Sequence, residues 1–207
     1  LVFHDIEEML KTRDESAAVS SAPAPPGSER RPQYSVMVID CAKARWDAKR
    51  ILSMATESYA SAMFDLEFED SKAHCLPYQW NSLELYESDT KLLHFTDMDI
   101  QPWISNINPL APIWMDALFR ALEDEYIKFD ELVQDVRAGW IRPGLLWQVE
   151  NRERNPMNVP ASVRARDEIF MPPHTVKRFS KHNNVATRAA LAIGRKIYRT
   201  LKRRRNG

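Results

Sequence analysis

Cysteine is scarce in this chain of 207 residues. Cys41 and Cys75 are the two that it has, and neither belongs to a Cys-x-x-Cys or Cys-x-x-x-His pattern. A disulfide framework or a structural zinc site would need more cysteines or such spacings, so the sequence argues against both. We expect two reduced thiols packed as small apolar side chains. Reduced thiols suit a reducing compartment, which predicts a cytoplasmic location.

Long apolar runs are also missing. No stretch approaches the roughly 20 residues that a transmembrane helix requires. Residues 1–6 have no basic segment ahead of their apolar side chains, which argues against a signal peptide. We expect residues 1–3 instead to be a strand that continues from an earlier segment of a longer chain. The length and the 44% of apolar residues fit one ordinary domain with appendages.

Acidic residues are absent from residues 177–207, which hold 11 of the 29 Lys and Arg. The other positions carry 18 basic and 29 acidic residues, so a net charge of zero combines an acidic body of net charge −11 with a basic tail. This asymmetry concerns binding partners rather than the fold.

Within the tail, residues 186–207 predict a basic amphipathic helix with an apolar stripe. Three interpretations remain open. The helix is a solvated terminus, or it binds an anionic membrane surface, which would suit an enzyme that acts on lipid-linked acceptors. Nucleic-acid binding is the third and has the least support, because no aromatic residues are interleaved with the basic ones and no known module is present.

Strands and helices alternate through the first half of the chain. Asp5 is placed to cap a short helix at residues 6–11, and Asp40 to cap the second of the predicted helices. A near-continuous apolar run predicts a strand that is buried on both faces, whereas a stretch rich in Ala, Ser and Pro predicts a mobile loop. The predicted elements are strands at 1–3, 34–40 and 91–95, helices at 6–11, 41–54 and 58–68, and the mobile loop at 17–32.

Helices dominate the second half. Apolar residues spaced three and four apart predict helices at 113–122 and 126–136, and apolar bulk continues over 140–149. Residues 151–173 show no sustained periodicity and are expected to be irregular. Alternating strands and helices followed by helices alone predict an α/β fold with a helical C-terminal portion.

His94 stands at the end of the predicted strand 91–95, where ligands gather in open α/β sheets. Asp97 and Asp99 follow closely, so the three side chains are candidates for a site that binds a divalent metal or a diphosphate. Gln101 and Trp103 come next, and the Trp ring offers a flat face for a nucleotide or sugar. Each residue also has an ordinary structural interpretation, as a hydrogen-bonded His, turn and cap carboxylates, or a buried Trp that anchors a turn.

The order of these segments carries a resemblance. Leu-Pro-x-x-Trp-Asn at residues 76–81, the His-Phe and Pro-Trp pairs within residues 94–103, and the strand with its following helix at residues 1–9 resemble the family 8 retaining glycosyltransferases. That group contains glycogenin and bacterial lipopolysaccharide sugar transferases. The resemblance implies a partial GT-A-like sheet over residues 1–125, followed by a helical extension at 126–150, an irregular linker at 151–185 and the basic helix at 186–207.

The resemblance also implies a chemistry, which is retaining transfer of a hexose from a UDP-type nucleotide sugar with Mn²⁺ as cofactor. His94 would complete the metal shell, and Gln101 and Trp103 would line the donor pocket. Asp97 and Asp99 join the candidate substrate-binding residues because they lie close by in the sequence. The family's Asp-x-Asp metal motif would precede Leu1, so we expect residues 1–207 to be inactive alone. The resemblance assigns no catalytic residue, donor sugar or acceptor.

This sequence departs from the family pattern in ways that support a second interpretation. Gln101 replaces a Lys whose charge would neutralise the leaving diphosphate, and the spacing from His94 is one residue longer. The Asn-x-Gly that precedes the family's apolar strand is also absent. The alternative is therefore a non-catalytic relative of the same fold that binds sugar nucleotides or serves as a scaffold.

Overall fold

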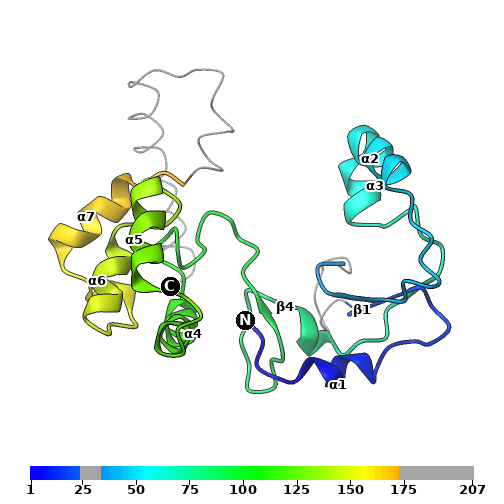
Figure 1. Cartoon of the computed structure of the whole chain (residues 1–207), viewed down its shortest axis with the longest axis horizontal. Helices are drawn as coiled ribbons and strands as arrows, with labels where there is room; N and C mark the ends of the chain where they lie inside the picture. Colours follow the sequence, from blue (N-terminus) through cyan, green and yellow to red (C-terminus); the bar gives the residue numbers. More distant parts are fainter. Residues whose placement is uncertain (24–33, 173–207) are drawn as a thin grey trace. The chain divides into compact units, whose positions relative to one another are not determined.

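A computed structural model describes residues 1–23 and 34–172, and it divides the chain into two units, Leu1–Phe95 and Thr96–Gly207 (Figure 1). The chain is mixed α/β, and all strands of the described residues lie in the first unit. The basic helix predicted at 186–207, and the part of the predicted linker from 173 to 185, lie outside the described residues.

Three short strands form the first sheet, in the order β2-β1-β3. The central strand β1 (Val19–Ser21) pairs antiparallel with β2 (Met37–Ile39), with Val19 opposite Ile39. On its other side β1 pairs parallel with β3 (Lys72–Ala73), with Val19 opposite Lys72. All three residues of β1 are buried, so the strand forms the middle of this sheet.

The prediction of a mobile loop at 17–32 is wrong for residues 17–22. Residues 17–22 are buried and contain β1, while 24–33 lie outside the described residues. Small Ala and Ser side chains have little intrinsic strand preference, but they fit a central strand that has neighbours on both sides. Ala22 also joins a core cluster with Met9, Leu76 and Trp80.

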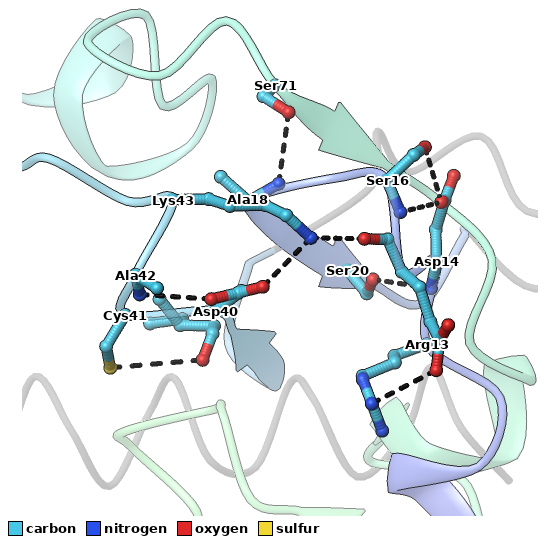
Figure 2. A network of polar contacts seen from close by, with 12 residues as sticks. Arg13, Asp14, Ser16, Ala18, Ser20, Asp40, Cys41, Ala42, Lys43 and Ser71 are labelled. Carbon is cyan, nitrogen blue, oxygen red and sulfur yellow. Dashed lines mark hydrogen bonds and ion pairs between the residues drawn. The ribbon is translucent and has the colours of Figure 1, made fainter.

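A polar network fixes the start of β1 (Figure 2). Asp14 donates its backbone N–H to Ser20 Oγ at 2.9 Å, and its carboxylate accepts the N–H and hydroxyl of Ser16. The ammonium of Lys43 bonds the backbone carbonyl of Glu15 and lies 2.9 Å from Asp40 Oδ2. The Lys43 bond lowers the pKa of Asp40, which keeps that exposed carboxylate ionised. These contacts hold the turn after β2 against the turn before β1.

Strand β2 confirms part of the strand predicted at 34–40, but its three residues are only half-buried. The expectation of burial on both faces is wrong because β2 is an edge strand of a small sheet. The expected packing of the cysteines is also wrong. Cys41 and Cys75 are free and exposed, and each follows a strand, β2 or β3, by two residues.

Helix α1 (Ile6–Leu10) is confirmed, and Asp5 caps it by accepting the N–H of Glu7 at 2.9 Å. The helix predicted from residue 41 is wrong over 41–47, because α2 (Ala48–Glu57) begins only after its own cap, Asp47. Asp40 instead caps a single turn, and Trp46 is held outside the helix by a 2.8 Å bond to Glu69. Helix α3 (Tyr59–Met63) is shorter than the predicted 58–68.

The second sheet has two strands. The 3-10 helix η1 (Tyr78–Asn81) leads into β4 (Ser82–Leu83), which pairs parallel with β5 (Leu93–His94). Strand β5 confirms part of the strand predicted at 91–95. Trp80 is fully buried.

The second unit is helical over its described residues and consists of α4 (Ala111–Glu123), α5 (Phe129–Ala138), α6 (Gly144–Glu150), η2 (Pro156–Asn158) and α7 (Ala161–Ile169). The first three confirm the predicted helical portion. Their core consists of Met115, Leu118, Phe119, Leu132 and Leu145. Helix α7 contradicts the irregular chain predicted over 151–173. Its inward side buries a carboxylate, Asp167, so the sequence lacks the apolar stripe by which helices are recognised. No helix among the described residues is both long and apolar enough to cross a membrane.

Candidate functional site

Three segments that are far apart in the sequence meet in the first unit. Residues 1–3 run beside residues 91–93, where Val2 forms an antiparallel bridge with Leu92 and the Phe3 N–H donates to Lys91 O at 2.8 Å. On the other side, Gln79 O accepts the N–H groups of Lys91 and Leu92 at 3.0 Å each. The segments 1–3, 76–81 and 91–94 therefore form one hydrogen-bonded group, in which 91–94 lies between the other two.

His94 is the last residue of β5, as the sequence predicted. It lies opposite Leu83 of β4, and its carbonyl accepts the N–H of Glu84 at 3.1 Å. The side chain is half-buried. Burial lowers the pKa of the imidazole, and Glu84 acts in the opposite direction. His94 is therefore neutral near pH 7, the form in which imidazole binds a metal.

Leu1 lies next to this histidine. Its nitrogen donates to Leu93 O at 2.6 Å. Any residues joined to Leu1 in a longer chain would therefore emerge beside His94. This position is set by β5 and by the bridge between Val2 and Leu92.

Asp97, Asp99, Gln101 and Trp103 belong to the second unit, whereas His94 belongs to the first. Asp97 Oδ1 accepts the N–H of Asp99 at 3.1 Å, so these two residues share one turn. Gln101 forms the next turn, where its carbonyl accepts the N–H groups of Ile104 and Ser105. Asp97 thus stabilises a turn, which was the ordinary structural interpretation of this residue.

Trp103 is half-buried and packs on Trp114 of α4, with ring centroids 5.7 Å apart. Helix α4 therefore contacts one side of the Trp103 side chain. Within the described residues, no group of three or more His, Cys, Asp or Glu side chains is arranged to hold a metal ion.

Sequence reasoning missed Arg142, a fully buried arginine that supports the Trp103 loop. Its Nε donates to Pro102 O at 2.9 Å, and its backbone N–H donates to Trp103 O at 2.9 Å. Its Nη1 donates to Asp167 Oδ2 at 2.8 Å, and its Nη2 bonds Gln148. Burial lowers the pKa of the guanidinium, and Asp167 offsets that effect. An Arg and an Asp separated by 25 residues give no recognisable sequence signal.

Asp167 also binds the start of α6. Its Oδ1 accepts the N–H of Gly144 at 2.7 Å, and a Cβ at residue 144 would lie 2.4 Å from Asp167 Oδ2. A Cβ at residue 144 would therefore require the Asp167 carboxylate or α6 to shift. The buried ion pair therefore joins the 102–103 loop, α6 and α7 into one assembly.

Comparisons of this chain with family models, with curated proteins and with solved structures found no match.

Proposed function

We propose that this chain is part of a retaining glycosyltransferase that moves a hexose from a UDP-type nucleotide sugar to an acceptor. The observation that carries the proposal is the meeting of residues 1–3, 76–81 and 91–94. Three parts of the resemblance lie within these segments: the strand at 1–3, Leu-Pro-x-x-Trp-Asn at 76–81, and His94. A chance likeness of separate motifs would not require them to be neighbours in space.

The proposal assigns His94 one place in the shell of a divalent metal, Mn²⁺. A neutral, half-buried imidazole at a strand end is a suitable nitrogen donor. The described residues supply no complete set of ligands, so the remaining carboxylates would come from a segment joined to Leu1. When bound, such a metal acts as a Lewis acid on a diphosphate leaving group. Gln101 and Trp103 are assigned to the donor pocket, and Asp97 and Asp99 remain candidate substrate-binding residues.

The test is Mn²⁺-dependent hydrolysis of UDP-hexoses by the full-length protein and its His94→Ala variant. We expect the variant to lose at least about 10-fold in metal affinity or rate, as is typical when a metal-binding group is disturbed. Mn²⁺ binding is measured separately by electron paramagnetic resonance. His4→Ala is the matched control, because His4 is exposed and its neighbour is Glu8. Equal hydrolysis by the His94 variant would remove His94 from the metal shell.

The second candidate is a non-catalytic relative that binds sugar nucleotides or serves as a scaffold. Gln101 favours it, because an amide cannot neutralise a leaving diphosphate as a Lys would. UDP binding without turnover in the full-length protein would select this candidate. Turnover by residues 1–207 alone would contradict the view that the metal site needs an additional segment.

A further inference from the structure

One face of α5 carries apolar side chains that lie outside the core of the second unit. Phe129, Val133 and Val136 are spaced four and three residues apart, so they share one side of the helix. The residue of α5 that is buried is Leu132, which belongs to the core cluster. Phe129 is exposed and the two valines are half-buried, and among the described residues neither valine packs against that cluster. The helix therefore has a second apolar face beside the one that it buries.

Exposed aromatic residues flank α5 in the chain. Tyr126 precedes the helix and is 83% exposed, and Trp140 follows its C-cap Gly139 and is 55% exposed. Together with Phe129, these are the exposed aromatic residues of the second unit within its described part. Tyrosine and tryptophan are enriched where proteins bind one another, because their large rings lose much water-exposed area on contact. The surface around α5 is therefore a candidate interface.

Two unpaired charges lie beside this apolar face. Asp130 belongs to the first turn of α5 and Arg137 to the last. Seven residues separate them, which is close to two helical turns, so both lie along the same edge of the face. Both residues are exposed, and neither side chain forms an ion pair or a hydrogen bond within the described residues. Each is thus available to an opposite charge on another molecule.

This pattern is complementary to itself. When two copies of α5 pack antiparallel about a two-fold axis near Val133, the start of each helix lies beside the end of the other. Phe129 of each copy then meets Val136 of the other. Residues on the same edge of two antiparallel helices face each other, so Asp130 of each copy meets Arg137 of the other. The arrangement forms this ion pair twice and covers both apolar faces.

A hollow beside the start of α5 has room for a large side chain of the second copy. Its volume is about 510 Å³, and part of its wall is apolar, formed by Leu122, Ile127, Phe129 and Val149. The antiparallel arrangement brings Trp140 of the second copy to this end of α5. Tryptophans that fill a pocket commonly supply much of the binding energy of an interface. The rest of the lining has two residues of each charge and so favours neither an anion nor a cation: Glu123, Glu125, Lys128 and Arg152.

We propose that α5 is a homodimer interface, on which a second copy of this chain packs in antiparallel orientation. A helix of ten residues is about 15 Å long, so the contact is at the small end of specific interfaces. The dimer is therefore weak, with a Kd in the micromolar range. The inference uses residues of the second unit alone and does not depend on the proposed transferase activity or on the metal site at His94.

Sedimentation equilibrium of the chain, from low to high micromolar concentration, measures this association. The average mass is expected to rise from that of one chain, 24.0 kDa, toward twice that value. Val133→Glu is expected to raise the Kd at least about tenfold, because it brings two carboxylates together at the two-fold axis. A mass that stays at one chain, or a dimer that Val133→Glu leaves unchanged, would overturn the inference.

Exchanging the two charges tests the orientation. Asp130→Arg and Arg137→Asp each replace two attractive contacts by repulsive ones, and each is expected to raise the Kd about fivefold to tenfold. The double variant restores both ion pairs and is expected to recover the Kd of the parent. Asp135→Arg is the matched control, because Asp135 is an exposed acid of α5 that lies about 140° around the helix from Asp130.

Circular dichroism establishes that each variant is folded. Because Asp130 and Arg137 are exposed, their exchange keeps the test informative if Val133→Glu does not fold. No recovery in the double variant, or an equal loss of dimer in Asp135→Arg, would overturn the antiparallel interface.

Discussion

At the scale of single residues, the ion pair between Arg142 and Asp167 is the contact most sensitive to change. Both side chains are at most 1% exposed. Asp167→Asn would leave the Arg142 charge buried without a counter-ion and would turn an amide donor toward the guanidinium. We expect the free energy of unfolding to fall by about 3–5 kcal/mol, the usual cost of breaking a buried pair. Urea denaturation followed by circular dichroism measures this loss.

The matched control for that change is Glu123→Gln. Glu123 pairs with Arg152, but both side chains are more than half exposed, so solvent screens their attraction. A loss of no more than about 1 kcal/mol is expected. Equal losses in Asp167→Asn and Glu123→Gln would contradict the importance assigned to the buried pair.

Gly144 tests the same contact from the other side. Gly144→Ala would place a methyl group 2.4 Å from Asp167 Oδ2, so the carboxylate or α6 would have to move. Overpacking of this kind costs about 1–3 kcal/mol. Thermal unfolding of the variant, compared with Ala165→Gly at an exposed site on α7, separates the steric effect from helix propensity. A variant as stable as the parent would show that Asp167 can move without loss.

At the scale of elements, the buried segment 17–22 differs most from its sequence pattern. Ala22 is fully buried in the cluster with Leu76 and Trp80. Ala22→Leu would add three carbons to a filled core and is expected to cost about 1–3 kcal/mol. Ala60→Leu on α3 is the control, because Ala60 is exposed and should change stability by less than about 0.5 kcal/mol. Chemical denaturation of both variants measures the difference.

Helices with an apolar stripe or a side-chain cap could be predicted from the sequence. Asp5 and α1, or Leu118 within α4, illustrate this, because their signals are local. The strand β1 and the helix α7 could not. Val19 is held by β2 and β3, which lie far along the chain, and Asp167 is held by Arg142. Tertiary partners decide such elements, and the sequence does not identify those partners.

The candidate site shows the same division. The position of His94 at a strand end could be predicted, because the apolar run before it is local. The support of Trp103 by Arg142 could not, and neither could the approach of the Leu1 amine to β5.

At the scale of the whole molecule, each unit has a hydrophobic cluster of its own. Trp80 and Leu76 belong to the first unit, and Met115 and Leu145 to the second. Compact units with separate cores tend to open as separate cooperative units. Asp167→Asn should therefore speed amide hydrogen exchange in α4 to α7 and leave β1 to β5 unchanged, whereas Ala22→Leu should do the reverse. Exchange measured by mass spectrometry on peptides from each unit reads both effects.

Combining the two substitutions makes this prediction quantitative. If the units open independently, each unit of the double variant exchanges at the rate seen in the single variant whose substitution lies in that unit. The opening free energies calculated from these rates should then agree within about 0.5 kcal/mol. If either substitution alone speeds exchange throughout residues 1–172, the chain unfolds as one cooperative body. The two clusters would then depend on each other energetically, and the division at Phe95 would describe the geometry of the chain without describing its stability.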